Sequence, residues 1–107
     1  MTINAIQFSG FNKKCPYSRY FIELKDKTYV FIVRWIDYCD CAVLTIMDEN
    51  DNKIISGRAL VNNLKIRNHN LPYELFFMQI NEETYEPILD NIEKEYALFY
   101  DDEDELE

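Results

Sequence analysis

Few residues of this chain are of the types that do acid–base chemistry. Its single histidine, His69, stands in a polar segment, where an imidazole is ordinarily solvated. The sequence has no Gly-x-Ser-x-Gly, His-Glu-x-x-His or glycine-rich phosphate loop. Paired carboxylates remain a possible acid and base, but most acids fall in turn-like segments and near the C-terminus, where water keeps them ionised. We therefore predict a protein that is not an enzyme and that uses no cofactor.

The three cysteines raise the question of a metal site. Cys39 and Cys41 are two residues apart and would face the same side of a strand, and Cys15 with His69 could complete a tetrahedral zinc site. Structural zinc sites typically pair their ligands at each end, which this spacing does not do. An odd number of cysteines without a secretory context also argues against a disulfide framework. We predict free thiols and no metal.

A second metal pattern begins at Asp48. Asp48, Asn50 and Asn52 have the spacing that opens a calcium loop. The next position, where such a loop requires glycine, is Lys53, and the closing acid would fall on Ala59. Asp and Asn also favour turns, so this segment is predicted to be a hairpin turn.

Charge is concentrated at one end of the chain. There are 20 acidic and 11 basic residues, a net charge of -9, yet six of the acids lie in residues 101–107 and residues 1–100 carry only -3. A nucleic-acid binder needs clustered cations to displace counterions from phosphates, and here the basic residues are scattered, apart from Lys13 and Lys14. No nucleic-acid partner is predicted.

Residues 101–107 are predicted to be a disordered, solubilising acidic tail. The alternative is electrostatic docking on a basic partner surface. That docking would use Asp101, Asp102, Glu103, Asp104 and Glu105. A further alternative, based on the overall charge, is a regulatory or inhibitory protein whose acidic end mimics nucleic acid.

The elements that would position these residues are strands. Residues 20–24 and 29–35 alternate apolar side chains with period two around a short polar segment, which predicts a β-hairpin. Further strands are expected at 41–47, 53–55, 64–66, 74–80 and 92–100, with a bulge or bend at Gly57. Residues 88–96 also fit a helical stripe, although we favour a strand there. With only two glycines, the ten asparagines are expected to take many positive-φ turn positions.

Length and composition indicate one domain. The chain has 107 residues, 48% of them hydrophobic and 15% aromatic, enough for a core over residues 1–100. No window approaches the roughly 18 apolar residues of a membrane span, and the first residues lack a signal-peptide pattern, so we expect an intracellular product or one assembled there. The fold class predicted is all-β: a small antiparallel β-sandwich or partly open β-barrel of about seven strands.

Six aromatic residues are candidates for core or subunit-interface positions. They are Tyr20, Tyr29, Phe31, Trp35, Tyr96 and Tyr100. On alternating strands such residues ordinarily pack in a core or an interface. The alternative is that Tyr20, Tyr29 and Trp35 form an exposed platform for a carbohydrate or another small ligand.

The order and spacing of the strand-like segments resemble those of a known family. The segments are YFIEL (20–24), YVFIVRW (29–35), LTIMD (44–48), IISGRAL (54–60), LPYEL (71–75) and LFY (98–100). Over nearly all of residues 20–100 they are similar to the small baseplate plug proteins of contractile-tailed phages, an all-β family. The chain departs from that family after Leu89, where Asp90 and Asn91 stand in place of a Leu-Gly turn.

The resemblance implies a structural protein of the virion or of a tailocin, at the hub of a tail baseplate, without an active site. It implies assembly, in multiple copies, with other baseplate, hub and tail-tube proteins. The expected location is the tail baseplate, after assembly in the host cytoplasm.

Overall fold

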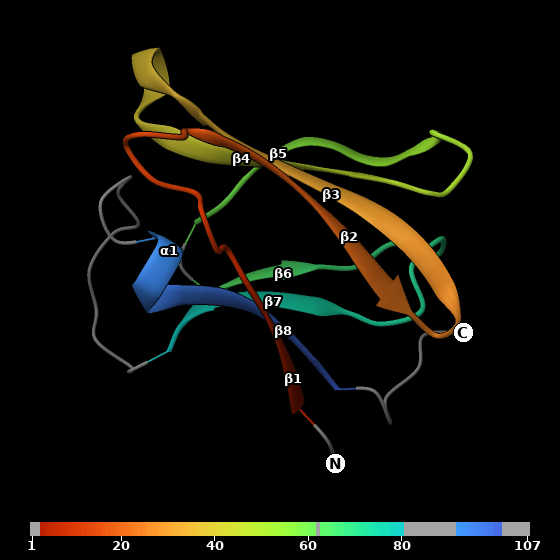
Figure 1. The fold of residues 1–107 in the computed structure, drawn as a ribbon. Coiled ribbons are helices and arrows are strands. Elements are labelled where there is room, and N and C mark those ends of the chain that lie inside the picture. The colour runs from red at the N-terminus through yellow and green to blue at the C-terminus, as the bar shows by residue number, and fades with distance from the viewer. Residues whose placement is uncertain (1–2, 62, 81–91, 102–107) are drawn as a thin grey trace.

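Two antiparallel sheets of four strands each face one another in the computed structural model, which describes residues 3–61, 63–80 and 92–101 (Figure 1). One sheet has the order β2-β3-β4-β5, and the other has the order β1-β8-β7-β6. The strands are β1 (Ile3–Gln7), β2 (Tyr17–Leu24), β3 (Lys27–Ile36), β4 (Cys41–Met47), β5 (Lys53–Ala59), β6 (Leu64–Ile66), β7 (Leu75–Gln79) and β8 (Tyr96–Asp101). The predicted all-β sandwich is confirmed, with eight strands in the described ranges instead of about seven.

The predicted hairpin of β2 and β3 is present, with a tighter turn than expected. Leu24 pairs with Lys27, so only Lys25 and Asp26 form the loop, with φ of 50° and 66°. Positive φ at both positions is the type I′ geometry, whose twist matches that of the flanking strands. The pairing continues without a break from this turn to Tyr17, opposite Arg34.

The predicted irregularity at Gly57 is also present. Between the pairs Leu44–Arg58 and Ile46–Ile55, β4 contributes one residue and β5 contributes two, which defines a bulge at Ser56 and Gly57. Gly57 has φ of 61°, and its N–H donates to Thr45 Oγ1 at 3.1 Å. A second register shift lies between Ile46 and Met47. Strand β5 is therefore bent along its length.

The hydrophobic core lies between the two sheets. The inward rows of β3, β4, β7 and β8 supply most of its side chains, and the loop after β1 adds Phe8 and Phe11. The fully buried members include Val33, Leu44, Ile46, Ile66, Leu75, Phe77 and Leu98. At roughly 25 cal/mol per Å² of apolar surface, this burial is the main stabilising term of the fold.

Two local predictions were wrong. The final strand does not begin at Ile92: Ile92–Glu95 is a single helical turn, α1, and β8 starts at Tyr96. Residues 88–91 lie outside the described ranges. Asparagine also does not dominate the positive-φ turns, since among the described non-glycine residues only Asn63 adopts one, beside Lys25 and three aspartates.

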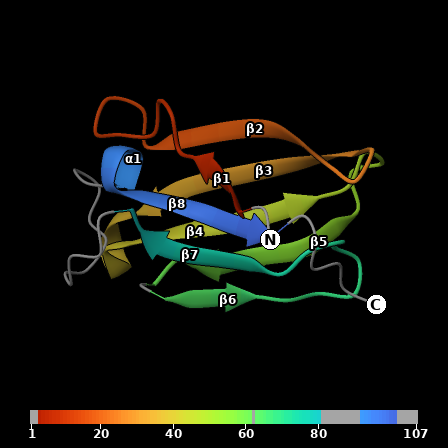
Figure 2. The same cartoon turned by 90° about the horizontal axis from the view of Figure 1, so that it is seen from below.

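The first strand was missed. Ile3–Gln7 forms β1, which pairs with β8 from Ile3–Asp101 to Gln7–Ala97. Figure 2 shows β1 and β8 side by side, with α1 at one end of the pair. No helix within the described ranges is long and apolar enough to cross a membrane.

Candidate interaction surface

The six candidate aromatics lie on the inner side of the sandwich or next to it. Tyr29, Phe31 and Tyr96 are buried. Tyr20, Trp35 and Tyr100 are half-buried and pack against the core. Tyr20, Tyr29 and Trp35 therefore do not form an exposed stacking platform, because Tyr29 is only 5% exposed.

Edge and stacking contacts join several of these rings. Tyr20 meets Phe8 edge-on with ring centroids 6.3 Å apart, and Phe8 meets Phe77 at 5.9 Å. Phe77 in turn stacks on Tyr96 at 5.0 Å. The rings thus form a continuous aromatic chain from one sheet to the other. A second stack, of Tyr73 on Tyr100 at 5.2 Å, lies elsewhere in the second sheet.

Tyr20 also fastens the segment that crosses between the sheets. Its hydroxyl donates to the carbonyl of Ser9 at 2.9 Å. Burial raises the pKa of Tyr20, and the nearby carboxylate of Glu93 raises it further. Glu93, on α1, accepts hydrogen bonds from the N–H of Gly10 at 2.7 Å and the side-chain amide of Asn12 at 3.4 Å. The phenol of Tyr20 and the carboxylate of Glu93 therefore both form hydrogen bonds with the backbone of the segment between β1 and β2.

Of the acidic docking candidates, the structure describes Asp101 alone. It is half-buried at the end of β8 and pairs opposite Ile3. Asp102, Glu103, Asp104 and Glu105 lie outside the described residues.

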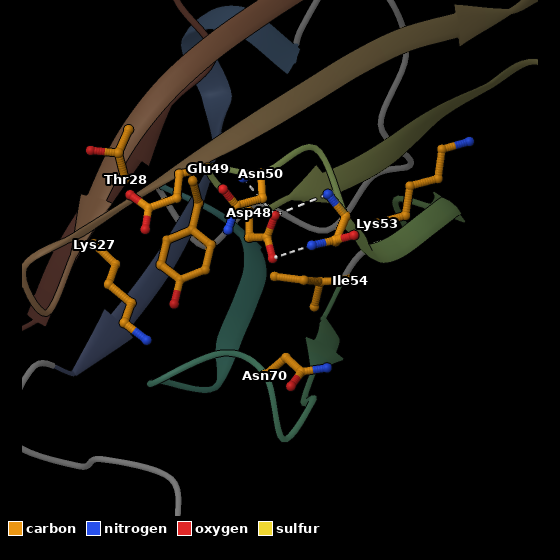
Figure 3. A pocket seen from close by; sticks show the side chains of 10 residues that line it. Lys27, Thr28, Asp48, Glu49, Asn50, Lys53, Ile54 and Asn70 are labelled. Atoms are coloured by element: carbon orange, nitrogen blue, oxygen red, sulfur yellow. Dashed lines mark hydrogen bonds between the residues drawn. The ribbon is translucent and has the colours of Figure 1, made fainter.

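A polar groove of about 390 Å³ lies between the start of β3, the β4–β5 turn and Asn70 (Figure 3). In the turn, the Oδ1 atom of Asp48 accepts the N–H groups of Asn50 and Asn52, each at 2.9 Å. These bonds, above all those from Asn52, lower the pKa of the Asp48 carboxyl. Burial raises the pKa of Tyr29, and the nearby carboxylate of Asp48 raises it further. The Asp48 carboxylate therefore accepts hydrogen bonds within its own turn, in agreement with the predicted hairpin turn.

The remaining chemically reactive side chains are dispersed. His69 is exposed in the loop after β6, Cys15 is exposed, and Cys41 is half-buried; both of these cysteines are in the thiol form. The thiol of Cys15 donates to the carbonyl oxygen of Tyr17 at 3.0 Å. In the described ranges no group of three or more His, Cys, Asp and Glu side chains has the geometry to hold a metal ion.

Apolar side chains also lie on the outer side of the β2-β3-β4-β5 sheet. Phe21 is 69% exposed, and the register places Val30 and then Met47 next to it in one row. The neighbouring row includes Ile32, and Tyr17, 49% exposed, stands nearer the strand's start. We call Phe21, Val30 and Met47 the outer row. Within the outer row Phe21 is exposed, Met47 is half-buried, and Val30, which lies between them, is buried at 8% exposure.

The second sheet has a similar outer side. Ala5, Phe99 and Phe76 are paired neighbours across β1, β8 and β7. Ala5 is exposed, and Phe99 and Phe76 are half-buried. Met78 and Ile80 add exposed apolar surface on β7 and just beyond it. The molecule therefore carries apolar side chains on both outer faces as well as in its core.

Sequence reasoning named the inner rows of β2 and β3 and missed the outer row. The signal was present, because Phe21, Val30 and Ile32 fill the alternate positions of the same strands. A strand that is apolar on both sides ordinarily has both sides covered.

Comparison with known proteins adds one match. A model of the family described as "Cyanophage baseplate Pam3 plug gp18" matches residues 7–103, which include seven of the eight strands in full. A search of the curated proteins found no match. Because the family match spans almost the whole sandwich, this chain belongs to the phage baseplate plug family.

Proposed function

We propose that the protein is a structural subunit of the baseplate of a contractile phage tail or a tailocin, where it acts as a plug or hub-associated component. The observation that carries the proposal is the family match over residues 7–103. In this role the chain assembles in the host cytoplasm, contacts other baseplate, hub and tail-tube proteins, and is incorporated in more than one copy. It performs no catalysis and binds neither cofactor nor nucleic acid.

The two apolar outer faces support an assembly role. An isolated sandwich ordinarily exposes polar side chains on its outer sides, whereas a subunit enclosed by neighbours gains free energy by burying apolar ones. The outer row on one face and Ala5, Phe99 and Phe76 on the other give neighbours two such faces to cover. Chemistry would instead require a cluster of reactive groups, and His69, Cys15 and Asp48 are each engaged locally or solvated.

The test is mass spectrometry of purified tail particles, with the copy number of this chain counted against the tube and hub proteins. A fixed, low stoichiometry in intact particles is the expected result. Absence of the chain from particles that contain the other baseplate proteins would contradict the proposal.

Within this assembly, the acidic residues Asp101, Asp102, Glu103, Asp104 and Glu105 are proposed to dock on a basic surface of a neighbouring protein. Deleting residues 102–107 leaves β8 intact, because the strand ends at Asp101. We expect the deletion to lower incorporation into particles and to weaken the salt dependence of that incorporation, since surface charges are screened by salt. Unchanged incorporation at every salt concentration would remove this docking role.

A further inference from the structure

Strand β2 is the longest regular free edge in the described part of the molecule. Edge strands β1 and β6 have five and three residues, and edge strand β5 is interrupted by its bulges. In contrast, β2 keeps an unbroken register with β3 over eight residues and pairs with no other strand in the described ranges. Natural sheets usually protect such an edge with bulges, prolines or lysines, and an unprotected edge can pair with another strand.

The backbone of β2 presents alternate residues to this edge. The N–H of Trp35 donates to the carbonyl of Pro16 at 2.9 Å, and in an antiparallel ladder every second pair is hydrogen-bonded. The even-numbered residues of β2 therefore bond to β3, and the odd-numbered ones direct their N–H and C=O groups to the open side. The thiol of Cys15 occupies the Tyr17 carbonyl. Arg19, Phe21 and Glu23 are left as the residues that can pair outward.

The charges of these three residues are self-complementary. In an antiparallel pair of two β2 strands centred on Phe21, Arg19 of each copy lies opposite Glu23 of the other. A centre at Arg19 would oppose two arginines, and a centre at Glu23 would oppose two glutamates, which destabilises a cross-strand pair. Only the register centred on Phe21 combines outward-facing backbone groups with opposed unlike charges.

We propose that β2 pairs with β2 of a second copy of this chain, antiparallel, across a two-fold axis at Phe21. The opposed pairs formed by Arg19, Phe21 and Glu23 are the hydrogen-bonded pairs of this ladder, and each exchanges two main-chain hydrogen bonds, whereas the pairs between them exchange none. The contact joins two four-stranded sheets into one eight-stranded sheet. It is an isologous interface, in which the same surface serves both copies.

The apolar outer row continues across this axis. Phe21 lies beside Val30, which lies beside Met47, so the paired sheets carry one strip running from Met47 of one copy to Met47 of the other. The two exposed Phe21 rings meet at its centre. Aromatic cross-strand pairs stabilise sheets, and here the pair also covers a ring that is 69% exposed in the single chain.

Charge reversal with rescue tests this pairing on the full chain. Sedimentation velocity at low salt, from micromolar to millimolar protein, is expected to show a monomer–dimer equilibrium. Arg19→Glu and Glu23→Arg each set like charges opposite one another at two symmetric places, and each is expected to raise the dimer dissociation constant about tenfold. The double variant Arg19→Glu/Glu23→Arg restores opposed unlike charges and is expected to restore the dimer.

The matched control is Arg58→Glu, which reverses an exposed charge on β5, at the far edge of the same sheet. It is expected to leave the dissociation constant unchanged, and circular dichroism should show that all four variants remain folded. A monomer at every concentration would overturn the proposal. The proposal would also be overturned if the double variant failed to restore the dimer. It would be overturned as well if the charge substitutions weakened binding to a different baseplate protein and left the dimer dissociation constant unchanged. The inference is independent of the tail location, which particle composition tests separately.

Discussion

At the scale of single residues, the aromatic chain is the feature that ties the two sheets together. Phe77 is one of its two inner members, fully buried, with Phe8 on one side and Tyr96 on the other. Aromatic pairs contribute about 0.5–1.5 kcal/mol beyond the burial of their area. Phe77 is therefore expected to contribute more to the free energy of unfolding than the burial of its own surface area would.

Phe77→Ala is expected to lower the free energy of unfolding by about 3–5 kcal/mol, because it leaves a cavity and removes two ring contacts. Phe21→Ala is the matched control, since Phe21 is mostly exposed and should cost less than about 1 kcal/mol in the monomer. Urea unfolding at micromolar protein measures both. Equal losses would show that the rings do not differ in packing as the structure describes.

Asp48 makes part of the stability depend on pH. Its pKa is lower in the folded chain than in the unfolded one, so its contribution is present above the unfolded pKa, about 3.9, and disappears as the pH falls through the folded pKa. Asp48→Asn removes the charge and the Oδ2 bond to the Asn52 amide, and we expect it to lower stability at pH 7.

The stability difference between this variant and the natural chain should narrow when urea midpoints are measured at successively lower pH below 4. Asp51→Asn serves as the control, because it changes a charge in the same turn without removing these hydrogen bonds. A difference that is constant with pH would contradict the assignment.

At the scale of elements, the bulge in β5 depends on one backbone conformation. Gly57 has φ of 61°, a region that costs other residues roughly 1–2 kcal/mol. A Cβ atom placed there would meet no atom within 4 Å, so a substitution tests the backbone alone. Gly57→Ala is expected to lower the free energy of unfolding by about 1 kcal/mol, and Gly57→Asn by less, because asparagine adopts this region more readily. Thermal unfolding of both variants checks the order; a neutral alanine would contradict it.

The hairpins could be predicted from sequence because their information is local. Period-two alternation and a polar loop sufficed for β2 and β3, and the Asp48 turn followed from residue types. Strand β1 could not be predicted, since Ile3–Gln7 is short and becomes a strand through its pairing with β8, far along the chain. Residues 88–96 did fit a helical stripe, but the single turn at Ile92–Glu95 is too short for periodicity to decide between helix and strand.

The same reasoning explains the candidate surface. Alternation showed which residues share a face of β2 and β3, but not which face the second sheet would cover. That choice depends on packing between distant segments, and it placed Tyr29 and Phe31 inside and Phe21 outside. The residues of each face could therefore be predicted from the sequence, but not which face is buried and which is exposed.

At the scale of the whole molecule, the exposed apolar faces favour association between molecules, whereas the net negative charge opposes it. The chain exposes apolar surface on both sheets and carries a net charge of -9 at pH 7, and like charge keeps such molecules apart. Light scattering is expected to rise steeply at about pH 4–5, where the carboxylates begin to bind protons and the charge is neutralised. Phe21→Ser, which reduces the apolar surface, should shift this onset to lower pH. Scattering that does not change with pH would contradict the claim that negative charge prevents association through the apolar faces.

The pairing of β1 with β8 has a mechanical consequence. Ile3 and Asp101 face each other at one end of that ladder, whose hydrogen bonds run across the strands. A force that pulls these two residues apart loads the bonds one pair at a time, as in opening a zip, instead of shearing them together. Such a ladder yields at low force. In the baseplate proposed above, this sandwich would therefore transmit load through neighbours that contact its faces and edges, and not through tension on β1 and β8.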